Sequence, residues 1–128
     1  MDHSVKVIDP RTFREGSQAV VHGLRRAFAD ILSAAGADPS QPQEISRRYG
    51  LDKTLAWRIS RVIRQEDAIV AVRDIPRRPS IGIFLRKMEK HGVPADRIAA
   101  MWKALDDFEA FVHIHSGDRE TLEVMVET

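Results

Sequence analysis

The chain has 128 residues and a formal net charge of only +1 at pH 7, and 43% of its residues are hydrophobic. This length corresponds to one domain, and the apolar fraction is too high for a disordered chain. The absence of cysteine excludes a disulfide framework and thiol-ligated zinc, and no stretch approaches the ~20 apolar residues that span a bilayer. Because the N-terminus also lacks the apolar run of a secretion signal, we expect a cytoplasmic protein without membrane association.

A long first helix is predicted from about 11 to 35. The first ten residues are expected to form a loose leader that ends at Pro10. Beyond it, apolar residues recur at intervals of three and four, which is typical of an amphipathic helix. This stripe consists of Val20, Leu24, Ala27, Phe28, Ile31, Leu32 and Ala35. Gly16 and Gly23 weaken the helix locally, and Gly36 is its natural end.

The segment 43–64 has the pattern of two short helices joined by a tight turn. Ile45 and Tyr49 are four residues apart and therefore share one face of the first helix. Gly50 follows directly, and glycine is the usual residue where a helix ends with a positive φ angle. Asp52 can accept hydrogen bonds from the free N–H groups of the next helix, and its charge suits that helix's positive end.

The second helix of this segment is expected to have one apolar and one polar face. The residues expected inside are Leu55, Ala56, Ile59, Val62 and Ile63. The residues expected to point outward are Lys53, Thr54, Trp57, Arg58 and Arg61. Such a helix cannot bury its own inner face, so the first helix is needed to complete a three-helix core.

This arrangement resembles the helix-turn-helix of bacterial transcription regulators, over about one sixth of the chain. The matching positions are Ile45, Ser46, Tyr49, Gly50, Leu51, Ala56 and Ile59. Ser46 replaces the usual alanine, and Ala56 occupies a position where a larger β-branched residue is common. The resemblance implies a sequence-specific DNA-binding protein that acts in transcriptional regulation, as a homodimer on a two-fold site.

DNA recognition requires donors at base edges and cations at phosphates. The candidate base contacts are Lys53, Thr54, Trp57 and Arg58. The candidate phosphate contacts are Arg47, Arg48, Arg61, Arg64, Arg77 and Arg78. Trp57 could stack on a sugar or touch a thymine methyl, but we favour its burial against the segment 65–85. A plain helical hairpin with a solvated basic face is the structural alternative for the whole motif.

The segment 69–85 is ambiguous. Its first part, 69–73, could be a short helix that begins near Asp67, or a strand, because it is rich in β-branched residues. If 69–73 and 81–85 were both strands, the protein would be a winged helix with a small hairpin at about 69–85. We favour a helix at about 81–91 instead, because the apolar residues have helical spacing and Ser80 is a suitable N-cap.

Two further helices are expected near the C-terminus. Pro94 opens the first, whose stripe consists of Ile98, Met101, Trp102, Leu105, Phe108 and Val112. A last helix is expected after Gly117, with four closely spaced apolar residues: Leu122, Val124, Met125 and Val126. Because these need cover on more than one side, we expect them to pack on a second copy, or the chain to be the N-terminal portion of a longer regulator.

The charge distribution supports a DNA face. Residues 40–90 hold twelve Lys and Arg against six Asp and Glu, whereas residues 91–128 hold three against eight. The middle of the chain is therefore basic and its end acidic, as expected for a DNA-binding face backed by a second module.

The sequence gives little sign of catalysis. His113 and His115 are two residues apart and so lie on different helix faces, unlike the i, i+4 pair of a helical metal site. There is no glycine-rich phosphate loop, nucleophile elbow or HExxH motif. We therefore expect a non-enzymatic protein without a cofactor or metal ion.

The overall prediction is a mainly all-α protein. A three-helix helix-turn-helix core at about 11–64 is followed by a helical dimerisation or support module at about 66–128. The expected function is sequence-specific binding of double-stranded DNA in the cytoplasm, at the nucleoid. The rival function is that of a helical protein–protein interaction module, such as an adaptor or an antitoxin.

Overall fold

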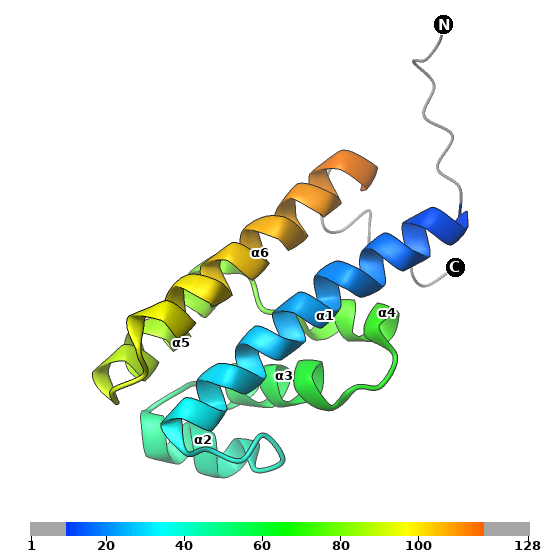
Figure 1. The fold of residues 1–128 in the computed structure, drawn as a ribbon. Coiled ribbons are helices and arrows are strands. Elements are labelled where there is room, and N and C mark those ends of the chain that lie inside the picture. The colour runs from blue at the N-terminus through cyan, green and yellow to red at the C-terminus, as the bar shows by residue number, and fades with distance from the viewer. Residues whose placement is uncertain (1–9, 117–128) are drawn as a thin grey trace, which may run out of the picture.

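The computed structural model describes residues 10–116, and every regular element in this range is helical. In chain order these elements are α1 (Pro10–Ala35), α2 (Pro42–Tyr49), α3 (Lys53–Arg64), α4 (Ala68–Ala71), the 3-10 helix η1 (Val72–Asp74), α5 (Arg78–Lys90) and α6 (Ala95–Ser116) (Figure 1). The predicted all-α fold is confirmed. The predicted last helix, after Gly117, lies outside the described residues.

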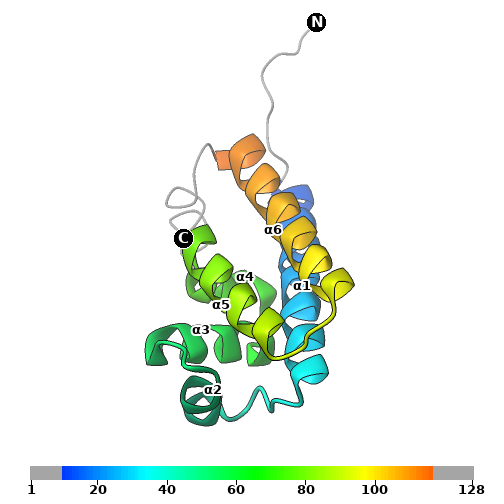
Figure 2. The same cartoon turned by 90° about the vertical axis from the view of Figure 1, so that its left-hand side faces the viewer.

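The two long helices, α1 and α6, pack side by side in opposite directions (Figures 1 and 2). Near the start of α1, a β-carbon added to Gly16 would lie 2.6 Å from the ring of Phe111, so the helices approach closely there. Towards the other end, the Arg97 Nη1 group donates a hydrogen bond to the Asp30 carbonyl oxygen at 3.5 Å. Helices α2 and α3 lie across the far end of α1, at the bottom of both views.

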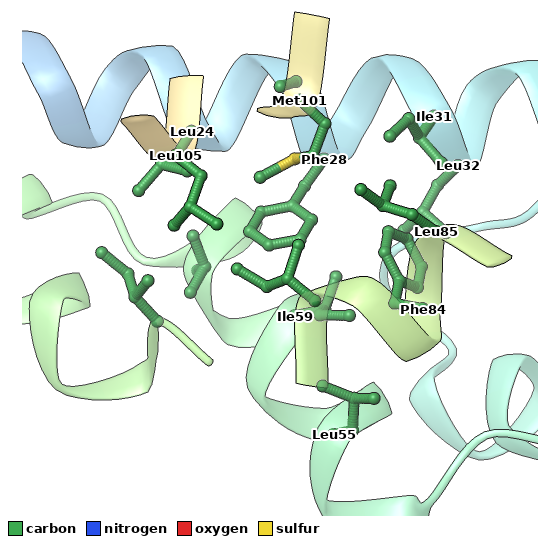
Figure 3. Packing of buried hydrophobic residues seen from close by; sticks show 14 of the residues in the cluster. Leu24, Phe28, Ile31, Leu32, Leu55, Ile59, Phe84, Leu85, Met101 and Leu105 are labelled. Carbon is green, nitrogen blue, oxygen red and sulfur yellow. The ribbon is translucent and has the colours of Figure 1, made fainter. Parts of the chain in front are cut away.

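One hydrophobic cluster connects the first half of the chain with the second. Phe28 of α1 lies near the middle of this cluster. Its ring centroid is 5.7 Å from that of Phe84 in α5. Around this pair pack Leu24, Ile31, Leu32, Leu55, Ile59, Leu85, Met101 and Leu105 (Figure 3). The boundary predicted between 64 and 66 falls in a loop, but the segments on its two sides share this core.

The winged-helix alternative is wrong. Residues 69–73 form the end of α4 and the start of η1, and residues 81–85 lie inside α5. Asp67 caps α4 by accepting a hydrogen bond from the Ile69 N–H at 2.9 Å. The β-branched Ile69 and Val72 are buried in the helical conformation, so burial against the core outweighs their preference for strands.

Two predicted helix starts differ from the structure. Helix α5 begins at Arg78, before the predicted N-cap Ser80, and Pro79 occupies its first turn. Proline fits this position because its missing N–H would be unsatisfied there in any case. For the same reason Pro10 begins α1, where we expected it to end the leader.

Candidate nucleic-acid interface

The turn between α2 and α3 has the geometry that the sequence predicts. Gly50 adopts a left-handed conformation with φ 65° and ψ 39°, and its N–H donates to the Ser46 carbonyl oxygen. The Leu51 N–H donates to the same oxygen at 3.0 Å. These bonds satisfy a carbonyl that the end of α2 would leave free, and Gly50 adopts this backbone without the strain of a side chain.

Ser46 contributes a second bond across this turn. Its hydroxyl donates to the Leu51 carbonyl oxygen at 2.7 Å, so the side chain bridges the end of α2 and the residue before the α3 cap. The resemblance to the regulator family marked this serine only as a departure from alanine. The structure shows that its hydroxyl forms a hydrogen bond across the turn, which alanine could not form.

Asp52 is the N-cap of α3, as predicted. Its Oδ2 atom accepts hydrogen bonds from the N–H groups of Thr54, at 3.0 Å, and Leu55, at 3.2 Å. These are two of the donors that the first turn of a helix leaves unpaired. The cap therefore defines where α3 starts and how its first exposed residues, Lys53 and Thr54, are presented.

Helix α3 separates into a buried and an exposed face. The buried residues are Leu55, Ala56, Ile59, Ser60 and Val62, whereas Ile63 is only partly buried. The exposed residues are Lys53, Thr54, Trp57, Arg58, Arg61 and Arg64. The predicted outward residues are therefore all at the surface, and Ser60 is an unexpected member of the inner face. Its hydroxyl is used there, since it donates to the Pro39 carbonyl oxygen at 2.5 Å.

The expected burial of Trp57 is wrong, because 49% of this side chain is exposed. Trp57 lies two residues before Ile59, which corresponds to about 200° around a helix and puts it opposite the core. The Arg61 guanidinium lies 4.8 Å from the centre of the Trp57 ring. Arg61 also donates from Nε to Asp74 Oδ2 at 3.0 Å, so η1 supplies a carboxylate at the edge of the outer face of α3.

The arginines predicted to contact phosphates differ in the ion pairs and hydrogen bonds that they form within the protein. Arg64 and Arg77 are exposed. Arg47 is exposed and forms a surface ion pair with Glu44 at 3.2 Å. Arg48 is exposed and reaches the Gly36 carbonyl oxygen at 3.4 Å. Such surface contacts are weak, so these four side chains can turn towards a phosphate at little cost.

Arg78 does not belong with this group. Its guanidinium donates to Asp106 at 3.1 Å and to Glu109 at 2.7 Å, and it lies 5.0 Å from the centre of the Trp102 ring. The hydrogen bond to Asp106, together with Glu109, raises the pKa of Arg78 above its ordinary value. This arginine joins α5 to α6, so we leave it out of the interface.

The loop before α2 is ordered by a short-range contact. Asp38 accepts hydrogen bonds from the Ser40 N–H at 2.9 Å and from the Ser40 hydroxyl at 2.8 Å. The bond from the N–H, then that from the hydroxyl, and to a smaller extent the charge of Arg64, lower the pKa of Asp38.

One structural residue of the site was not predicted. Arg25 of α1 donates from Nε to the Val62 carbonyl oxygen at 3.0 Å and from Nη2 to the Gln65 carbonyl oxygen. A cation at the C-terminal carbonyls of a helix is favourable because it faces the negative end of the helix dipole. Arg25 thus fixes the end of α3 to α1, while Asp52 fixes its start.

Neither a cluster of metal-ligating side chains nor a membrane-spanning helix occurs among the described residues. Between 10 and 116 no three His, Cys, Asp or Glu side chains are grouped so that they could hold a metal ion. None of the described helices is long and apolar enough to cross a membrane.

Comparisons with known proteins do not assign this chain to a family. No protein-family model, no curated protein and no solved structure matches it.

Proposed function

We propose that this protein binds double-stranded DNA sequence-specifically and regulates transcription, with α3 entering the major groove. The observation that carries the proposal is the outer face of α3. Lys53 and Arg58 on this face have no ion-pair partner within the described part of the chain, so they remain available to guanine O6 and N7. A helix is about 10–12 Å across with its side chains, which suits a groove about 12 Å wide.

The side chains on and near α3 suit a DNA duplex better than a metal cation or a small anion as the ligand. Thr54 and Trp57 lie on the same outer face and can contact a base edge and a thymine methyl or sugar. Five exposed arginines on α2, at the end of α3 and in the loop before α5 suit phosphates: Arg47, Arg48, Arg61, Arg64 and Arg77. Phosphate contacts supply most of the affinity, whereas base contacts supply the sequence preference.

A homodimer is part of this proposal. A helix-turn-helix dimer presents two recognition helices to half-sites roughly 34–36 Å apart, so the DNA site has two-fold symmetry. This function places the protein at the nucleoid, in the cytoplasm, and requires no cofactor and no catalytic residue.

The test is selection of bound sequences from a pool of random duplex DNA, followed by measurement of affinity at several salt concentrations. We expect an enriched motif with two-fold symmetry, and an affinity that falls linearly on logarithmic axes by about 0.9 per phosphate contact. Absence of retained DNA at low salt, or an affinity that salt leaves unchanged, would overturn the proposal.

A protein partner for the same face is the second candidate. Trp57 and Arg61 are both exposed and lie against each other, and these two residue types are enriched at the energetic centres of protein interfaces. Salt separates the two functions, because apolar protein association does not weaken steeply as salt rises. A partner that protects Trp57 equally at low and high salt would favour this second function.

A further inference from the structure

Helix α5 reaches the turn between α2 and α3 at two points. The His91 ring, directly after α5, meets the Tyr49 ring edge to face, with 4.7 Å between their centroids. One helical turn earlier, the Lys87 Nζ atom lies 3.6 Å from the place that a β-carbon would occupy at Gly50. The ammonium group of Lys87 is therefore positioned directly at the turn that leads into α3.

The charge of Lys87 is not neutralised by the fold. No carboxylate lies within ion-pair distance of it among the residues that the structure describes. Arg78 and Lys103, by contrast, are paired with carboxylates of α6. Asp106 and Glu109 thus offset Arg78 at the α5–α6 contact, and Asp107 offsets Lys103 within α6. Lys87, at the turn, has no such carboxylate among the described residues.

Lys87 is also partly held in place. It is only partly exposed, and its Nζ atom lies against the backbone turn at Gly50. A side chain that is already confined loses less conformational freedom when it binds than a fully exposed lysine does. A confined, unpaired ammonium is well suited to a phosphate, which lysine binds as a compact point charge.

We propose that Lys87 contacts a DNA phosphate beside the turn, so that the backbone-contacting surface extends from the helix-turn-helix onto α5. This inference rests on the proposed function, because it takes α3 to lie in the major groove. When the start of α3 enters the groove, the turn at Gly50 faces the rim of the groove, where the phosphates run. Lys87 then fixes the register of the protein on DNA without reading sequence.

The first test compares the salt dependence of binding to a random-sequence duplex for the wild type, Lys87→Ala and Lys87→Arg. We expect Lys87→Ala to bind roughly threefold or more weakly at low salt, with a logarithmic salt slope smaller by about 0.9, since one phosphate contact is lost. Lys87→Arg keeps the charge and should restore the slope. Lys103→Ala is the matched control, because Lys103 is an exposed lysine paired with Asp107 on α6, and it should leave the slope unchanged.

The outcomes separate this inference from the proposed function. If the wild type binds with a steep salt slope and Lys87→Ala keeps that slope, Lys87 merely supports the end of α2 and the inference is wrong. If the wild type does not bind the duplex at all, both the inference and the proposed function are wrong. A thermal unfolding curve for each variant shows whether a loss of binding comes from unfolding. If Lys87→Ala does not fold, Lys87→Met takes its place, because it keeps the length of the side chain without its charge, and a slope unchanged from the wild type then overturns the inference.

A second test places the residue on the DNA directly. Because the chain has no cysteine, a Lys87→Cys variant can carry a single iron chelate that cleaves nearby DNA. We expect cleavage at one short stretch of backbone in each half of a site obtained by selection. The same chelate on a Lys103→Cys variant should not cleave there, and equal cleavage from both positions would overturn the inference.

Discussion

The Ser46 hydroxyl donates a hydrogen bond to the Leu51 carbonyl oxygen across the α2–α3 turn, with 2.7 Å between the two oxygen atoms. Helix-turn-helix motifs commonly have alanine at this position, which would suggest that Ser46→Ala is harmless. The contact argues otherwise, because the turn positions α3 relative to α2. Serine in this chain therefore has a role that alanine cannot fulfil.

We expect Ser46→Ala to lower the free energy of unfolding by about 1 kcal/mol. Loss of the bond leaves the Leu51 carbonyl without this partner and costs about 1–2 kcal/mol, and the better helix propensity of alanine returns about 0.5 kcal/mol. Denaturant unfolding measures the difference. Ser33→Ala is the control, since Ser33 is an exposed residue of α1, and it should be neutral or slightly stabilising. A stabilised Ser46→Ala protein would contradict this role.

Two glycines of α1 should respond to alanine in opposite directions. A β-carbon at Gly23 would have nothing within 4 Å, whereas one at Gly16 would lie 2.6 Å from Phe111 Cε2. Gly23→Ala should raise the free energy of unfolding by about 0.5–1 kcal/mol, because alanine restricts the unfolded chain and favours the helix. Gly16→Ala should lower it by about 1–3 kcal/mol, because the Phe111 ring must shift from its packed position beside Phe13.

Thermal unfolding of these two variants, each compared with the wild type, measures both effects in one experiment. Equal stabilisation by the two substitutions would mean that the Phe111 ring gives way freely and that α1 and α6 are not closely packed at Gly16.

Features with a local cause were predictable from the sequence. The helical stripes follow from residue spacing, the Asp52 cap from residue type, and the left-handed turn from Gly50. The exposure of Trp57 was also within reach, because Ile59 was assigned to the inner face and Trp57 lies opposite it. The size and apolar character of Trp57 favour burial, but helical phase is the stronger constraint on a short helix.

Features that depend on distant residues were not predictable. Arg78 is separated by 28 and 31 residues from its partners Asp106 and Glu109, so no local pattern marks it as part of the α5–α6 contact. Arg25 binds the backbone carbonyls of Val62 and Gln65 at the end of α3, and backbone groups carry no sequence signal. The β-branched residues of 69–73 favour a strand locally, and burial of Ile69 and Val72 together with the Asp67 cap makes the segment helical.

Asp74 should limit the affinity of the proposed DNA face. It accepts a hydrogen bond from Arg61 at 3.0 Å and puts a negative charge at the edge of that face. We expect Asp74→Asn to strengthen binding to a random-sequence duplex, and to steepen the logarithmic salt slope by about 0.9 if Arg61 gains one phosphate contact. Fluorescence anisotropy at several salt concentrations measures both quantities.

The control for Asp74 is Asp107→Asn on α6, which releases Lys103 instead and should leave DNA binding unchanged. Weaker binding by Asp74→Asn would mean that the carboxylate is needed to hold Arg61 against Trp57.

Arg58 and Arg47 should affect DNA binding in different ways. Arg58 lies on the outer face of α3 without an ion-pair partner in the described structure, so Arg58→Ala should cost about 1–3 kcal/mol at one base pair and relax the preference there. Arg47 lies on α2 and has only a surface ion pair with Glu44 to give up. Arg47→Ala should therefore weaken binding to all sequences alike and reduce the salt slope by about 1.

Repeating the sequence selection with each variant, and titrating each against a selected and a scrambled site, distinguishes the two effects. If neither substitution alters binding, α3 does not enter the groove and the DNA-binding face must lie elsewhere on the molecule.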